Sequence, residues 1–365
     1  MKLRVFALAL TILATAARGA LLFAGAQTTA SNVGLTLYDD VRDELRELQR
    51  QTSDVTGPMP TYMALSPNKR FLYLTNEVDA GQVVSLRLSR SGNDSVALTS
   101  LGKAPTKSKG PVHLTVTKSG RFVLVASYSV GSITVLAVNA KGFANQVVSQ
   151  VVFSGGSHVV PGRQDGPHAH CVTLSPDNNY VFVSDLGNDK IMQFKFNSAT
   201  GELAANTPAF VAVGAGAMPR HMAFHPDGSA LFLNTEHSNE LIKFAYDTQS
   251  GTLSQVKAVK TTQKTGVASG AVRVTTDGRF VVVSNRWGGD DSLVVFTAEL
   301  APVGTFPTTA SGAPRDFILV GKTLFVANEN ANNIDAFRLQ DNGELTRVKS
   351  AAPTISKPQV LLSLQ

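Results

Sequence analysis

Five ionisable residues stand in short polar segments between apolar runs, and their types suit acid–base chemistry. His168 and His170 in GPHAH are two positions apart, so both lie on one face of an extended strand. Arg220 in PRHMAFHP and Arg286 in SNRWGG each carry a planar guanidinium that suits a carboxylate or a phosphate. Glu236 follows Arg220 by 16 residues, across one predicted strand turn, so we expect the two to lie close together. A carboxylate held near arginines stays ionised and can accept a proton from water or from carbon.

A metal site is one alternative for the histidine pair. Such a site would need a third and a fourth ligand. His113, His221 and His225 are available, but no ligand spacing singles them out. A histidine beside a turn can also simply satisfy backbone groups. We therefore expect neither a metal nor another cofactor.

Structural roles are the alternative to catalysis for the charged residues. Arg220 and Arg286 could form ion pairs with Glu236 or Asp185 that brace adjacent strands, and both roles can hold at once. Asp185 stands in DLGND, where a turn follows directly, so we predict that it caps the turn rather than acts in catalysis.

These residues belong to a unit that repeats along the chain. Each copy has a polar turn such as SPDNN and then an apolar run with a polar end such as VFVSDL. The turns begin at Ser66, Thr117, Ser175, His225 and Thr275. The runs end at Glu77, Tyr128, Leu186, Glu236, Arg286 and Glu329, at separations of 51, 58, 50, 50 and 43 residues. A period of about 40–50 residues with short strands predicts an all-β fold of the β-propeller type.

The number of blades follows from the complete copies and the two chain ends. Six copies are predicted at 58–105, 109–155, 166–212, 217–262, 266–309 and 312–351. Further apolar segments at 20–27, 33–40 and 358–365 supply enough strands for one more blade. We predict a seven-bladed β-propeller over residues 20–365, a single domain whose ring is closed by N- and C-terminal strands sharing one blade. Such closure leaves no open sheet end.

One segment carries conflicting signals. In residues 37–51 the apolar residues Val41, Leu45 and Leu48 lie at helical spacing, whereas the repeat requires strands. We predict a strand for the first half and leave the second half open.

The repeat also predicts which residues meet. Innermost strands of a propeller line a central channel, so equivalent positions converge. An inner-strand column holds Thr61, Val112, His170, Arg220, Gly270 and Arg315, and the ends of the following runs form a second column. Residue types change from blade to blade, whereas a purely structural column would repeat one type. We predict that His170, Glu236, Arg220 and Arg286 are catalytic, and that His168, Arg315, Tyr128, Glu77 and Glu329 bind substrate. The polar loop 154–170 is the longest interruption of the pattern and a further part of this predicted site.

The chain start resembles a secretory signal peptide. Residues 1–19 begin with two basic residues, Lys2 and Arg4, followed by an apolar core and by small residues before a cut at Ala20, with an uncleaved anchor as the alternative. The remaining chain has 30 Lys and Arg against 27 Asp and Glu, a net charge of +3. With no basic cluster, we expect no nucleic-acid partner, and no membrane association after cleavage. Cys171 is the single cysteine, so no disulfide can form within the chain, and Asn93 begins a glycosylation sequon. We expect a secreted monomer or small homo-oligomer.

Several motifs together resemble one family. GPHAHCVTLSPDNNYVFVSDLGNDKI, MPRHMAFHPDGSALFLNTE, VVVSNRWGGDDSLVVF and GAPRDFI are similar to segments of the lactonase family of seven-bladed propellers. That family includes propeller-type 6-phosphogluconolactonases and carboxy-cis,cis-muconate cyclases, and the resemblance covers about residues 20–365. One departure is the turn NRWGGDDS, which is longer than usual and carries Trp287.

The resemblance implies a metal-free site at one mouth of the channel. Its residues fall on His170 (or His168), Arg220, Glu236 and Arg286. In the hydrolysis of a sugar-acid lactone, Glu236 or His170 would activate water, while the arginines bind the substrate anion and the developing oxyanion. A muconate cyclase-like enzyme would instead hold a polycarboxylate and move a proton at carbon. Export argues against a cytosolic phosphorylated lactone, and a non-catalytic binding propeller is the remaining alternative.

Overall fold

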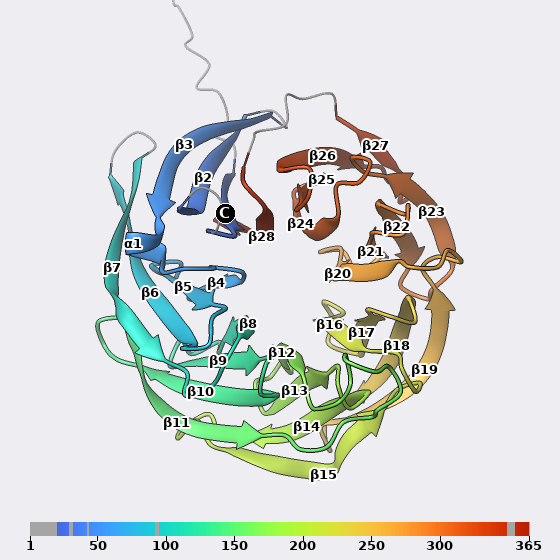
Figure 1. Ribbon diagram of the computed structural model, residues 1–365, viewed down its shortest axis with the longest axis horizontal. Helices are drawn as coiled ribbons and strands as arrows, with labels where there is room; N and C mark the ends of the chain where they lie inside the picture. Colours follow the sequence, from blue (N-terminus) through green and yellow to red (C-terminus); the bar gives the residue numbers. More distant parts are fainter. Residues whose placement is uncertain (1–19, 29–31, 42–43, 92–94, 349–354, 365) are drawn as a thin grey trace, which may run out of the picture.

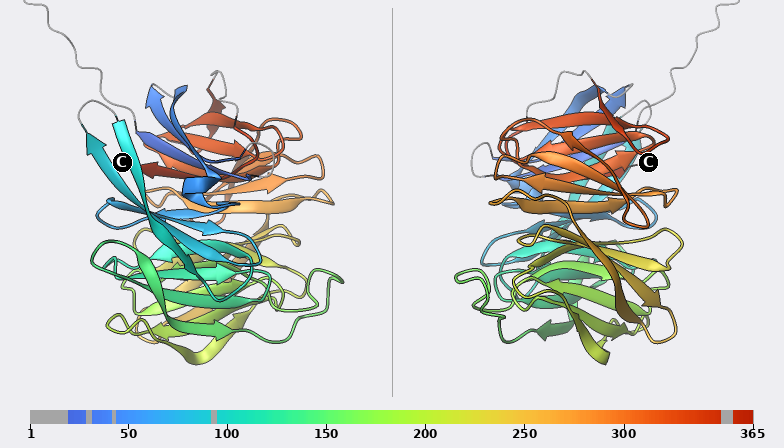
Figure 2. Two further views of the ribbon diagram at one scale, coloured as in Figure 1. Left: turned by 60° about the vertical axis from the view of Figure 1, so that its left-hand side comes forward. Right: turned by 90° about the vertical axis from the view of Figure 1, so that its right-hand side faces the viewer.

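Short apolar strands and tight polar turns form the whole described structure. The computed structural model describes residues 20–28, 32–41, 44–91, 95–348 and 355–364. These residues form seven four-stranded antiparallel sheets set around a central axis (Figure 1). The side views in Figure 2 show the twist of the sheets, which turns the outer strands away from the direction of the inner ones. The predicted all-β, seven-bladed propeller is therefore confirmed.

The first three blades in chain order each run outward from the channel. The first contains β4 (Met63–Leu65), β5 (Phe71–Asn76), β6 (Gln82–Ser91) and β7 (Ser95–Pro105). The second contains β8 (Pro111–Val116), β9 (Phe122–Ser127), β10 (Ser132–Val138) and β11 (Ala144–Val152). The third contains β12 (Ala169–Leu174), β13 (Tyr180–Asp185), β14 (Lys190–Phe196) and β15 (Leu203–Ala212).

The next three blades repeat this order. The fourth contains β16 (Pro219–Phe224), β17 (Ala230–Thr235), β18 (Glu240–Asp247) and β19 (Thr252–Lys260). The fifth contains β20 (Ala268–Val274), β21 (Phe280–Arg286), β22 (Ser292–Thr297) and β23 (Pro302–Pro307). The sixth contains β24 (Pro314–Val320), β25 (Thr323–Asn328), β26 (Asn333–Leu339) and β27 (Leu345–Arg347).

The seventh blade joins the two ends of the chain. Its strands are β28 (Pro358–Leu364), β1 (Leu21–Ala26), β2 (Val33–Val41) and β3 (Glu44–Thr52), in that order from the channel outward. β28 pairs antiparallel with β1, and Phe23 lies opposite Leu362. The predicted sharing of one blade is confirmed. The half of segment 37–51 that the sequence left open is also strand, because β3 pairs antiparallel with β2 and this tertiary pairing overrides the local helix propensity. A four-residue helix, α1 (Ser53–Thr56), follows it.

The repeated polar turn has a local cause. In the third blade the Ser175 hydroxyl donates to Asp177 Oδ1 at 2.5 Å and accepts from the Tyr180 N–H at 2.9 Å, while Asn178 has a φ of 61°. The fifth blade has the same bonds at Thr275, with Gly278 in the left-handed position. Side-chain oxygens of Ser, Thr and Asp thus close the hairpin between the first and second strands.

The core lies between the blades. Seven clusters of buried apolar side chains each join neighbouring sheets, as where Phe232 and Leu241 of the fourth blade pack on Val281 and Val283 of the fifth. Second strands such as β17 and β25 are buried along their whole length, whereas the outer β19 is mostly exposed. None of the described helices is long and apolar enough to cross a membrane. The predicted signal peptide and the acceptor of the sequon, Asn93, lie outside the described residues.

Candidate active site

A repeated backbone contact carries the second column of residues to one mouth of the channel. The Tyr128 N–H donates to the Gly110 carbonyl at 2.7 Å, and the Glu236 N–H donates to the Met218 carbonyl at 2.7 Å. The Leu186 N–H makes the equivalent bond to the His168 carbonyl in the third blade, and the Glu329 N–H makes it to the Ala313 carbonyl in the sixth. In these blades the bond joins the end of the second strand to the residue before the inner strand. Side chains that follow the second strands therefore meet those that begin the inner strands.

Glu236 lies at the centre of this meeting point. Its Oε2 accepts hydrogen bonds from Arg220 Nε at 3.0 Å and from Arg286 Nη2 at 3.1 Å. Its Oε1 accepts one from Arg163 Nη2 at 2.6 Å. Glu236, Arg220 and Arg286 are at most 6% exposed, whereas the Arg163 side chain is 45% exposed. The expected proximity of Arg220 and Glu236 is confirmed, and the ion-pair role foreseen for the arginines is present.

Three guanidinium groups on one carboxylate leave the cluster with two net positive charges. Burial by itself raises the pKa of Glu236, but Arg286 and Arg220 together outweigh it, so this pKa lies well below its usual range. Arg286 keeps two buried nitrogens, Nε and Nη1, with no hydrogen-bond partner among the described residues. Such unsatisfied donors in a buried cationic site suit an anion or an oxyanion.

His170 adjoins the cluster as an uncharged base. It is 7% exposed, and its Nδ1 has no hydrogen-bond partner among the described atoms. Burial lowers the pKa of His170 well below its ordinary value, and the charge of Arg220 lowers it further. The ring is therefore neutral at physiological pH and can accept a proton.

His168 and Tyr128 form a second, more exposed part of the site. Their rings stack at a centroid distance of 4.3 Å, and His168 Nδ1 lies 2.9 Å from the Tyr128 carbonyl oxygen. His168 also donates its backbone N–H to Asp185 Oδ1 at 2.8 Å. The same Asp185 accepts bonds from Asn188 in the following turn, so it has the turn-capping contacts that its position predicted. Tyr128 meets His170 edge-on, with ring centroids 5.8 Å apart.

The other predicted binding residues differ in how they join the cluster. Arg315 Nη1 donates to Glu329 Oε2 at 3.3 Å, and Glu329 also accepts from Gln27 of the shared blade. Arg315 lies close enough to His170 to influence its pKa electrostatically. Glu77 ends the equivalent strand of the first blade, and no described hydrogen bond or ion pair connects its side chain to Glu236 or the arginines.

A layer of rings lies next to the cluster along the channel. His221 is 5.2 Å from His170 and 5.5 Å from His113, centroid to centroid, and His113 packs on Tyr62 at 3.9 Å. Cys171 Sγ lies 3.4 Å from His113 Nε2. These histidines do not form a ligand set: within the described part of the chain no three or more His, Cys, Asp or Glu residues gather in a way that could hold a metal ion.

Arg163 was missed by the sequence analysis. Its loop, 154–170, was predicted to contribute to the site, but the residues named from this loop were His168 and His170 and not Arg163. The loop folds back through Gln164, whose side chain donates to the Leu186 carbonyl at 2.9 Å. The arginine lies outside the repeat, so no column contained it. Its position in the longest polar interruption was the available signal.

Known proteins resemble this chain over most of its length. A family model described as a lactonase, 7-bladed beta-propeller, matches residues 21–362. The 6-phosphogluconolactonase of Bacillus subtilis is 34% identical over 312 residues, covering 82% of this chain and 85% of that protein. The 6-phosphogluconolactonase of Formosa agariphila is 29% identical over 302 residues, covering 79% and 84%. The structure of a periplasmic gluconolactonase from Pseudomonas aeruginosa superposes with a TM-score of 0.84 at 29% identity, covering 95% and 99%.

Proposed function

Because this chain belongs to the lactonase family of seven-bladed β-propellers, we propose that it hydrolyses the lactone of a sugar acid at the Glu236 cluster. The supporting relatives are described as 6-phosphogluconolactonases and as a gluconolactonase. One observation carries the proposal. A single buried cationic site contains both the Arg286 donors that have no partner and the neutral ring of His170.

The proposed reaction adds one water to the ring ester. His170 accepts a proton from water as the water oxygen bonds to the lactone carbonyl carbon, and the carbonyl oxygen becomes an oxyanion. Arg286 Nε and Nη1 donate to that oxyanion. The bond between the carbonyl carbon and the ring oxygen then breaks. The proton held by His170 passes to the departing alkoxide, which gives the hydroxy acid.

Glu236 has a positioning role in this proposal. Both of its carboxylate oxygens already accept hydrogen bonds from arginines, whereas Nδ1 of His170 has no partner among the described atoms. The same carboxylate fixes the guanidinium groups of Arg220 and Arg286 in the orientation that receives the substrate. Of the two bases that the sequence left open, the site geometry favours His170.

Arg163 is the arginine best placed to exchange partners. It comes from a loop, its side chain is 45% exposed, and it holds only one oxygen of Glu236. We propose that an anionic group on the substrate draws Arg163 away from Glu236. That carboxylate would keep its two buried arginine partners.

Two finer points concern the direction of the reaction and the location of the protein. A ring-closing reaction on a polycarboxylate, as in a muconate cyclase, is the second candidate, because the net positive cluster would also bind carboxylates. We propose that the protein is exported. The segment 1–19 supports this, as does the likeness to a periplasmic gluconolactonase. Export would favour an unphosphorylated lactone.

The proposal is tested by titrating the acid released from glucono-1,5-lactone, its 6-phosphate and a carboxymuconolactone, with a chelator present. Wild type is compared with Glu236→Gln and His170→Gln. We expect chelator-resistant turnover in wild type and at least a 100-fold loss of kcat in each variant, with the far-UV circular dichroism spectrum retained.

The control is Thr346→Val on the exposed outer strand β27, which should match wild type. Full activity of Glu236→Gln or His170→Gln would remove the role assigned to that residue. A folded wild type that turns over none of the lactones would point to a binding propeller.

A further inference from the structure

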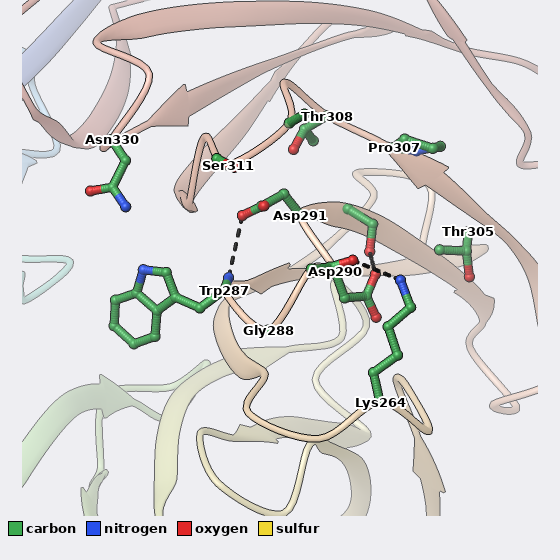
Figure 3. Close-up of a pocket in the computed structure, with 13 residues that line it drawn as sticks. Lys264, Trp287, Gly288, Asp290, Asp291, Thr305, Pro307, Thr308, Ser311 and Asn330 are labelled. Atoms are coloured by element: carbon green, nitrogen blue, oxygen red, sulfur yellow. Dashed lines mark hydrogen bonds between the residues drawn. The ribbon is translucent and has the colours of Figure 1, made fainter.

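A cavity beside the Glu236 cluster is lined by the long turn NRWGGDDS, which departs from the family pattern. The cavity has a volume of about 560 Å³, within the range of small-molecule sites, and lies between the fifth and sixth blades. It is lined by Trp287, Asp291, Lys264, Thr308, Ser311 and Asn330, among others. In the view of Figure 3, Asn330, Ser311 and Thr308 lie along one side and Trp287 along the other, with Asp291 between them.

Trp287 links this cavity to the proposed active site. The Arg286 guanidinium lies 4.2 Å from the centroid of the indole, and Arg286 in turn bonds Glu236. The indole is 42% exposed, although a tryptophan of a soluble protein normally covers most of its surface. A ligand that fills the cavity can thus contact the indole while its reacting end lies at Arg286.

The turn fixes the backbone from which the indole projects. Trp287 has a φ of 68°, an uncommon value for a bulky residue. Its backbone N–H donates to Asp291 Oδ1 at 3.3 Å. Lys264 Nζ donates to the Gly289 carbonyl at 2.7 Å. A Cβ on Gly288 would lie 2.6 Å from the backbone of Gly266, so only glycine permits this close approach. A turn that is already ordered loses little backbone entropy when a ligand binds to it.

The polar groups of the cavity favour an uncharged ligand with hydroxyl groups. The Thr308 residue is 6% exposed, and its Oγ1 has no hydrogen-bond partner among the described residues. The lining contains two carboxylates, Asp290 and Asp291, and one ammonium, Lys264, so it disfavours an anionic group. A pyranose ring presents C–H groups on its faces and hydroxyls on its rim, which matches an indole face bordered by hydroxyl, amide and carboxylate groups.

We infer that this cavity is a second subsite for a neutral glycosyl unit, so that the enzyme accepts the lactone of an aldobionic acid, a disaccharide. The inference rests on the proposed lactonase function for its reacting end. The lactone ring would lie at Arg286 and His170, and the attached sugar would stack on Trp287 and bond Thr308.

Binding is measured first, without reaction. Trp287 is the single tryptophan of the chain, so the fluorescence reports on the cavity and on Arg286 beside it, and Thr308→Val separates the two. Methyl β-cellobioside, methyl β-maltoside and methyl β-gentiobioside serve as unreactive probes. We expect a saturable fluorescence change with at least one of them, weakened at least 10-fold in affinity by Thr308→Val and unaffected by Thr346→Val.

Turnover is measured second, on the matching aldobionolactones and on glucono-1,5-lactone. We expect one aldobionolactone to have a kcat/KM at least 10-fold above that of the monosaccharide lactone. The ratio should fall toward one in Trp287→Ala and in Thr308→Val, and Trp287→Phe should retain part of it.

The two proposals fail in different ways. Turnover of glucono-1,5-lactone with no fluorescence change and no preference for a disaccharide overturns the subsite and leaves the lactonase intact. A saturable fluorescence change with no lactone hydrolysed supports the sugar subsite and removes the lactonase function.

Discussion

At the scale of single residues, Glu236 shows how one carboxylate can organise a cationic site. Its partners differ sharply in exposure: Arg220 and Arg286 are 2% exposed, and the Arg163 side chain is 45% exposed. Removing a buried partner would leave a buried charge uncompensated, at a cost of about 3–5 kcal/mol. Removing an exposed one costs far less, commonly below about 1 kcal/mol. Arg163 is therefore the residue at which binding can be tested without unfolding the site.

We predict that Arg163→Ala lowers kcat/KM about 100-fold for glucono-1,5-lactone 6-phosphate and less than 10-fold for the unphosphorylated lactone. The reason is the loss of a charge-assisted hydrogen bond to the anionic group. Steady-state kinetics on both substrates measures the difference. Arg121→Ala is the matched control, since Arg121 is also exposed and bonds a backbone carbonyl, at Ala199. Equal losses on the two substrates would contradict the binding role.

His170 gives a prediction for the pH dependence of the rate. Burial and Arg220 lower its pKa, so the neutral base persists below the ordinary histidine value of about 6.5. We expect kcat/KM to stay level from pH 8 to 6.5 and to fall only at lower pH. Initial rates after a rapid shift in pH measure this while the protein remains folded. A decline centred at or above pH 7 would argue against His170 as the base.

At the scale of elements, closure of the ring depends on a strand from the far end of the chain. β28 is the innermost strand of the shared blade, and it packs against β24 and β4 of the adjacent blades. Leu361 of this strand is 2% exposed, and its N–H donates to Asp316 Oδ2 at 3.0 Å. The same Asp316, on the inner strand of the sixth blade, pairs with Arg273 on the inner strand of the fifth. The terminal strand thus connects the sheet ring to a charged pair in the channel.

We predict that Leu361→Ala lowers the free energy of unfolding by about 2–5 kcal/mol, because it leaves a cavity in the core between the sixth and seventh blades. Urea unfolding followed by circular dichroism measures the change. The control is Val152→Ala, because Val152 is 58% exposed. This change should alter the free energy of unfolding by less than about 0.5 kcal/mol. A similarly small effect at Leu361 would mean that the terminal strand contributes little to closure.

At the scale of the whole molecule, the channel holds three buried histidines that are neutral in the folded state. Burial, with the charge of nearby arginines, lowers the pKa of His113, His170 and His221 well below the ordinary value. The unfolded chain therefore binds more protons than the folded protein below pH 6.5. Stability is fully present above that pH and is lost as the pH falls. Glu236, with its lowered pKa, adds to the loss only at much lower pH.

We predict that the free energy of unfolding falls below pH 6.5 with a slope of up to about 4 kcal/mol per pH unit, since each of three histidines contributes about 1.4. Urea midpoints between pH 8 and pH 5.5 measure the slope. His113→Phe keeps a ring against Tyr62 and should reduce the slope by about a third. His237→Gln, at an exposed residue, should leave it unchanged. A stability that is flat from pH 8 to pH 5.5 would contradict the neutral buried state.

The repeat explains why so much could be predicted from the sequence. Each copy carries its own turn chemistry and its own apolar runs, so the blades, their number and the shared blade follow from local signals. The meeting of His170, Arg220, Glu236 and Arg286 also follows, because rotation about one axis brings equivalent positions together. The sequence alone determined these residues and their common location.

The tertiary structure decided what lies between the repeats. Arg163 reaches Glu236 from a loop whose path no period describes, and Trp287 is placed by a turn that packs on Gly266 of the preceding loop. The protonation of the site is likewise a property of the folded protein. The neutral state of His170 arises from burial and from the charge of Arg220, whereas the lowered pKa of Glu236 arises from its arginine partners against the effect of burial. Spacing along one chain does not encode how deeply a group is buried or which charges surround it.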